Sequence, residues 1–133
     1  MIPEFDENGN LPEGIHPATL DEIDARFGRE TETRKAQMQS IRWLIELVGR
    51  DDVRRIILNG SFVTDVAEPN DVDCALFVGP DFGRRGVSAK EWNEGLPFIH
   101  FDIVDQVVLD DYVNRIFAFG RGRQAKGMIE VIR

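Results

Sequence analysis

The sequence predicts a small domain of the α/β (α+β) type, in which helices pack against a mixed β-sheet. Two short runs, 53–59 and 72–78, are apolar on both faces, which suits central strands covered by helices. The segment 33–48 has apolar residues at three- and four-residue spacing, which indicates an amphipathic helix. Helical and strand patterns follow one another along 133 residues, a length that fits one domain covering the whole chain.

The N-terminal part is expected to be an irregular arm followed by a short helix. Residues 1–18 contain three prolines and a glycine flanked by asparagines, so we expect no regular element there. Thr19 and Glu22 have the spacing of a capping box, and Gly28 can end the helix that follows.

The longer helix at 33–48 is expected to bury one face and to end at Gly49. Arg34 and the other charged residues are expected to lie largely off the buried face. Trp43 and, further along the chain, Trp92 are interpreted as packing residues. The apolar stripe consists of Met38, Ile41, Leu44, Ile45 and Val48.

The second half of the chain is expected to alternate helices and strands. Ser88 and Glu91 form a second match to the capping box, and Pro97 precedes a third apolar run. In chain order the expected elements are a helix at 89–95, a strand at 98–104, a helix at 110–119, a loop at 120–123 and a strand at 128–132.

Composition excludes several functional classes. A net charge of −8 argues against broad binding of nucleic acids or anionic membranes by the isolated chain. The single cysteine, Cys74, allows no intrachain disulfide, and two distant histidines make a Cys/His zinc cluster implausible. No apolar run is long enough to span a bilayer, and the acidic N-terminus is unlike a signal peptide. A reducing cytoplasmic location is therefore the default expectation.

Two carboxylates, Asp71 and Asp73, lie one residue apart at the start of a predicted strand. In an extended strand they point to the same face, where their repulsion favours a shared cation. Mg²⁺ is typically held by one or two carboxylates together with substrate phosphates. The alternative is that Pro69, Asn70 and Asp71 are simply turn residues.

Gly60 and Ser61 end the preceding predicted strand, where they can form a sharp turn. Backbone N–H groups and a hydroxyl in such a turn are suited to phosphate oxygens, particularly if 62–66 form a short helical turn. A purely structural turn is the alternative.

Gly60-Ser61, nine intervening residues and Asp71-Val72-Asp73 resemble the signature of the DNA polymerase β-type nucleotidyltransferase superfamily, over about residues 33–105. More narrowly, they are similar to the minimal nucleotidyltransferases, some of which act as antitoxins. The segments 9–16 and 60–64 and the pair Lys126-Gly127 also resemble a group of uncharacterised bacterial proteins assigned to that superfamily.

The resemblance implies the nucleotidyltransferase fold and a third carboxylate on a later strand. Asp102 is the best match, with Asp105 as the second choice, and His100 shares the face of Asp102 but is more typical of a structural sheet histidine. Asp71, Asp73 and Asp102 would then be catalytic residues that bind two Mg²⁺ ions and the NTP.

The same resemblance implies roles for other residues. Gly60 and Ser61 would bind the outer phosphates of the nucleotide. Arg123 and Lys126, with Arg121, would neutralise pyrophosphate or contact the acceptor, although a solvated loop is the more usual role for such a cluster.

The implied function is transfer of a nucleoside monophosphate from ATP or another NTP to an unknown acceptor, which could be a protein side chain, an RNA end or a small molecule. The alternative is a catalytically silent domain of the same fold that acts as a binding or antitoxin-like module. Because the domain is minimal, completion of the site by a partner protein or a second copy is a further hypothesis. A purely structural protein whose acidic residues keep it in solution is the third class.

Overall fold

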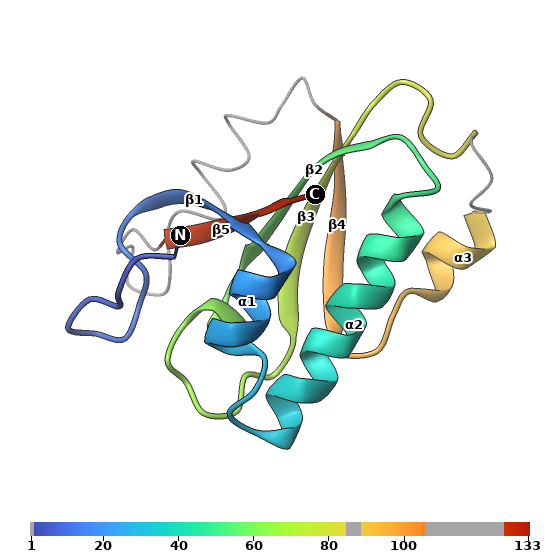
Figure 1. Ribbon diagram of the computed structural model, residues 1–133. Helices are drawn as coiled ribbons and strands as arrows, with labels where there is room; N and C mark the ends of the chain where they lie inside the picture. The colour runs from blue at the N-terminus through green and yellow to red at the C-terminus, as the bar shows by residue number, and fades with distance from the viewer. Residues whose placement is uncertain (1, 85–88, 106–126) are drawn as a thin grey trace.

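The computed structural model describes residues 2–84, 89–105 and 127–133, in which helices cover one face of a five-stranded sheet (Figure 1). The strands, in the order β1-β5-β2-β3-β4 across the sheet, are β1 (Gly14–Thr19), β5 (Gly127–Ile132), β2 (Val53–Asn59), β3 (Val72–Val78) and β4 (Ile99–Asp105). The helical elements are α1 (Leu20–Phe27), α2 (Glu32–Val48), the 3-10 turn η1 (Ser61–Val63) and α3 (Ala89–Glu94).

The sheet is mixed, as predicted. β1 runs parallel to β5, and β4 runs parallel to β3, whereas β2 is antiparallel to both of its neighbours. The prediction of an irregular arm at 1–18 is wrong for its last five residues, because β1 begins at Gly14. β1 lies at the edge of the sheet, where Pro17 is tolerated because only one side of the strand pairs.

Both N-terminal helices form where the capping signals place them. The Thr19 hydroxyl accepts a hydrogen bond from the Glu22 N–H at 3.2 Å, and the Glu22 carboxylate accepts one from the Thr19 N–H at 3.0 Å. This capping box is confirmed, as is the end of α1 at Gly28. α2 begins one residue earlier than expected, with Thr31 as its N-cap.

The bounds of β2 and β3 are those predicted, and α3, β4 and β5 lie within one residue of the expected positions. The predicted helix at 110–119, the loop at 120–123 and the capping residue Ser88 lie outside the described residues. No helix in the described part of the chain is both long and apolar enough to cross a bilayer.

The core has two parts, one on each face of the sheet. α1 and α2 pack their apolar faces onto one side of the sheet, where Cys74 is buried as predicted. Trp92 is also buried as predicted, whereas Trp43 is 45% exposed because it lies on the outer side of α2. A smaller cluster covers the opposite face and consists of Ile57, Ala75, Phe77, Val104 and Met128.

Candidate functional site

The first pair of predicted site residues lies at the start of β3. Asp71 directly precedes the strand and is exposed, and Asp73 is its second residue and is partly buried. Side chains alternate along a strand, and Cys74 points into the core under the helices. Asp73 therefore points to the face of the sheet that is opposite α1 and α2.

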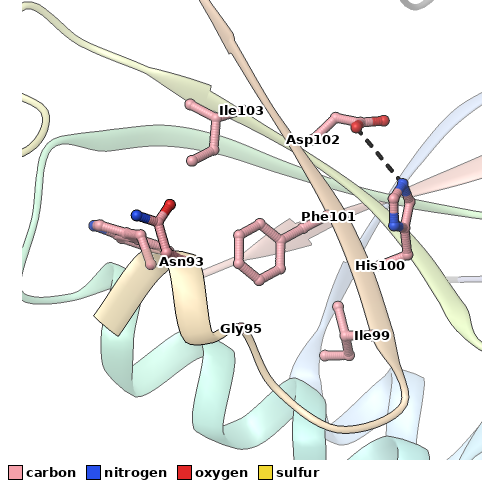
Figure 2. Close-up of a pocket in the computed structure, with 8 residues that line it drawn as sticks. Asn93, Gly95, Ile99, His100, Phe101, Asp102 and Ile103 are labelled. Carbon is pink, nitrogen blue, oxygen red and sulfur yellow. Dashed lines mark ion pairs between the residues drawn. The ribbon is translucent and has the colours of Figure 1, made fainter. Parts of the chain in front are cut away.

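The third predicted carboxylate lies on the same face. In the parallel pairing of β3 with β4, Asp73 is opposite His100, and Ala75 is opposite Asp102. Residues opposite each other on neighbouring strands share a face, so Asp73, His100 and Asp102 point to the same side. Figure 2 shows His100 and Asp102 together on one side of β4, with the His100 Nε2 and Asp102 Oδ1 atoms 3.7 Å apart.

The surroundings of Asp73 shift the pKa of its carboxyl group. Burial raises the pKa of the Asp73 carboxyl, and the charges of Asp71 and Asp102 raise it further, while His100 lowers it. The ionised form of Asp73 is therefore disfavoured by its surroundings and would be stabilised by a cation placed on this face.

The predicted glycine bend lies directly against Asp73. Gly60 has φ 80° and ψ −162°, a conformation open essentially only to glycine. A Cβ atom at this position would overlap the carboxylate of Asp73, so the absence of a side chain allows the two to come together. Ser61 begins η1, which is shorter than the helical turn expected at 62–66.

Two residues of α2 hold the loop between the bend and the aspartates, and neither was predicted. The side chain of Gln37 donates a hydrogen bond to the Pro69 carbonyl at 2.7 Å. Arg34, only 1% exposed, is not off the buried face as expected. Its guanidinium donates to four backbone carbonyls at 2.6–3.2 Å, those of Phe27, Phe62, Thr64 and Val66.

The helical periodicity of the sequence indicates that Arg34 is buried. Arg34 lies four residues before Met38 and seven before Ile41, which places it on the apolar stripe of the helix. A charged residue on such a stripe must have buried partners, because burial of an unpaired charge is very costly.

A second acidic pair, Asp51 and Asp52, lies in the connection between α2 and β2 and is buried. The Asp51 carboxylate accepts hydrogen bonds from the Trp92 indole N–H and the Gly83 N–H, each at 2.9 Å. Asp52 accepts from Arg54 at 2.7 Å and from the Asp81 N–H at 3.0 Å. This pair fixes the turn after β3 and anchors α3 through Trp92, which is a structural role.

The other predicted site residues are the basic residues near the C-terminus and Asp105. Arg121, Arg123 and Lys126 lie outside the described residues. Asp105 is the last residue of β4 and is opposite Val78. Within 2–84, 89–105 and 127–133, no group of three or more His, Cys, Asp or Glu side chains lies close enough together to hold a metal ion.

The described fold and site define a mixed α+β domain with a carboxylate-bearing sheet face beside a glycine bend. The chain belongs to DUF6932, a family of unknown function, whose model matches residues 3–132. No curated protein and no solved structure is significantly similar to it.

Proposed function

We propose that this protein is a Mg²⁺-dependent nucleotidyltransferase that moves a nucleoside monophosphate from an NTP to a hydroxyl acceptor. The observation that carries the proposal is that Asp73 and Asp102, from neighbouring strands, lie on the same face of the sheet, with Asp73 directly against Gly60. A nucleotidyltransferase fold and a cytoplasmic location, where NTPs are present, are parts of the same proposal.

The donor set suits a hard cation. Asp71, directly before β3, and Asp73, on β3, would supply carboxylate oxygens together with Asp102 on β4. Mg²⁺ is usually bound by one or two carboxylates plus substrate phosphates, so a site of this kind needs no preformed group of three ligands. When bound, Mg²⁺ would neutralise the phosphates and lower the pKa of an attacking hydroxyl.

Each part of the site has a separate task. Asp71 and Asp73 would orient the nucleotide through its phosphates, and Asp102 would face the acceptor hydroxyl. Gly60 leaves room for the Asp73 carboxylate, and the Ser61 N–H and hydroxyl, directly after the bend, would contact the outer phosphates. Arg34 and Gln37 keep the connecting loop in one path, so that these groups stay in register.

Ligand-dependent stability tests binding. A ligand present at 100 times its Kd stabilises a fold by about 2.7 kcal/mol, so Mg²⁺ with the preferred NTP should raise the melting temperature clearly. Asp71→Asn combined with Asp73→Asn should abolish this shift. Glu46→Gln is the control, because it removes a carboxylate that lies exposed on α2, away from the site. Absence of any shift with all four NTPs and Mg²⁺ would refute nucleotide binding.

Transfer of the label from an α-phosphate-labelled NTP to a cell lysate tests chemistry. Wild type and Glu46→Gln should label an acceptor, whereas the variant with both aspartates changed should not. Nucleotide binding without any label transfer would favour the silent binding module of the same fold. Equal labelling by the wild type and the double variant would remove the catalytic assignment of Asp71 and Asp73.

A further inference from the structure

The outer edge of β4 offers a row of backbone hydrogen-bonding groups. β4 is the last strand of the sheet, and no strand in the described part of the chain pairs with its outer side. The Val72 N–H donates to the Phe98 carbonyl at 2.8 Å, so that carbonyl faces β3. Because backbone groups alternate in direction along a strand, the N–H groups of Ile99, Phe101 and Ile103 face away from β3.

A pocket of about 380 Å³ follows this edge, between β4 and the end of α3 (Figure 2). The rings of Trp92 and Phe101 form its apolar side, with their centroids 5.9 Å apart in an edge-to-face arrangement. Ile103 is 44% exposed beside them. The pocket is lined by Trp92, Asn93, Gly95, Ile99, His100, Phe101, Asp102 and Ile103.

The two sides of β4 differ in chemistry along this pocket. Phe101 and Ile103 lie on one side of the strand, and His100 and Asp102 lie on the other, as Figure 2 shows. A ligand that follows the edge would therefore meet apolar and acidic surfaces at alternate positions. Asp102 belongs both to this pocket and to the carboxylate face proposed to bind the nucleotide.

We propose that this edge binds the acceptor, and that the acceptor is an extended polypeptide segment that adds a strand to β4. This inference rests on the proposed function. Side chains of an added strand alternate, so one residue would pack on Phe101 and Ile103 while the next faces Asp102. A segment of alternating apolar and hydroxyl residues fits both surfaces, and its Ser, Thr or Tyr hydroxyl would be the nucleophile.

Charge favours a polypeptide over a nucleic acid. The chain has a net charge of −8, and the residues that line the pocket include the carboxylate of Asp102 but no lysine or arginine. On the bordering helix, Glu91 is paired with Arg50 and Glu94 with Lys90. A polyphosphate backbone would be repelled here, whereas a neutral or basic peptide would not. A row of outward N–H and C=O groups is also matched by another extended polypeptide backbone.

The chemical step balances without a further reactant. The hydroxyl oxygen of the segment bonds to the α-phosphorus of the NTP, and the bond from that phosphorus to the bridging oxygen breaks. The electron pair of the broken bond leaves with pyrophosphate, and the hydroxyl proton passes to water. The product is a nucleoside monophosphate joined to the side chain by a phosphodiester bond.

Peptide binding is tested without nucleotide, so that it does not depend on transfer. A displayed library of random nonapeptides is selected on the full chain and then measured against three variants. Ile103→Pro removes an outward N–H, a change that edge strands tolerate, and Ile103→Val is the matched control that keeps it. Ile103→Lys keeps the N–H but places a charge on the apolar side, so it serves if the proline variant fails to fold.

We expect selected peptides to alternate apolar and hydroxyl residues. Their affinity should fall about tenfold or more in Ile103→Pro and Ile103→Lys, a loss of about 1.4 kcal/mol, and stay within about twofold in Ile103→Val. Bound peptide should slow hydrogen exchange at the N–H groups of Ile99, Phe101 and Ile103. Absence of selected peptides, or equal binding to wild type and both disruptive variants, overturns the proposal.

Further outcomes separate this inference from the proposed function. Selected peptides that bind at the edge but receive no label from an NTP would leave a peptide-binding surface and overturn the transferase proposal. Labelling of RNA in a lysate, with no peptide selected, would keep the transferase and overturn this inference. A concentration-dependent dimer that Ile103→Pro abolishes would show that a second copy of the chain, not an acceptor segment, occupies the edge.

Discussion

Replacing Gly60 with alanine should destabilise the fold through two separable effects. The first is backbone strain, because φ 80° with ψ −162° costs a residue other than glycine about 1–3 kcal/mol. The second is overlap of the new methyl group with the Asp73 carboxylate, which must move at a further cost of about 1–3 kcal/mol. The free energy of unfolding should therefore fall by about 2–6 kcal/mol, a large part of the 5–15 kcal/mol typical of a domain.

A double-mutant cycle measured by urea denaturation separates the two effects. In an Asp73→Ala background the carboxylate is absent, so Gly60→Ala should cost only the strain of about 1–3 kcal/mol. The difference between the two backgrounds, about 1–3 kcal/mol, reports the contact between the bend and the carboxylate. A cost for Gly60→Ala below about 0.5 kcal/mol would refute the strain. Equal costs in both backgrounds would show that Asp73 does not lie against Gly60.

Three further predictions concern stability. Arg34→Met should lower the free energy of unfolding in urea by about 3–5 kcal/mol, because it leaves four carbonyls without their donor. Lys35→Met, at an exposed position of the same helix, should change it little, and similar costs for both variants would refute the role of the Arg34 hydrogen bonds. Asp73→Asn should stabilise the nucleotide-free chain at neutral pH. Burial and neighbouring carboxylates raise the folded pKa of Asp73, so the stability this group contributes is complete below its unfolded value of 3.8 and is lost as the pH rises through the folded value. Melting curves should show the advantage of the asparagine variant growing with pH above 3.8, and an advantage that shrinks would contradict this sign. Trp92→Phe should cost about 1–3 kcal/mol, because the buried Asp51 carboxylate loses the indole donor, and an unchanged urea midpoint would contradict that role.

The elements that the sequence predicted are those whose signals are local. β2 and β3 each contain an apolar run, at 56–58 and 74–78, and each strand is bounded by turn residues. α1 carries its own capping box. β1 has no such run, and it becomes a strand only by pairing with β5, more than a hundred residues further along the chain. A partner at that separation leaves no trace in the local pattern of a short edge segment.

In the candidate site, too, local sequence patterns predicted some features, and others depend on contacts between distant segments. The spacing of Asp71 and Asp73 predicted a shared face, and period-2 alternation extended that expectation to Asp102 once its strand was recognised. The overlap of Gly60 with Asp73 depends on the pairing of β2 with β3, which the sequence does not specify. The partners of Arg34 lie up to 32 residues away and are main-chain carbonyls. Because every residue type has such a carbonyl, the sequence at those positions does not predict these hydrogen bonds.

The main-chain partners of Arg34 have a consequence for how this protein can change over time. The guanidinium contacts carbonyl oxygens, which every amino acid possesses, so the course of 62–66 is fixed in part by a residue of a helix. Within the segment, the Thr64 hydroxyl adds hydrogen bonds with Ser61 and Val66. Exposed positions such as Asp65 and Val66 are therefore open to substitution without loss of that course. New ligand preferences could arise at these positions by single substitutions, whereas substitution of Arg34 would disrupt the loop.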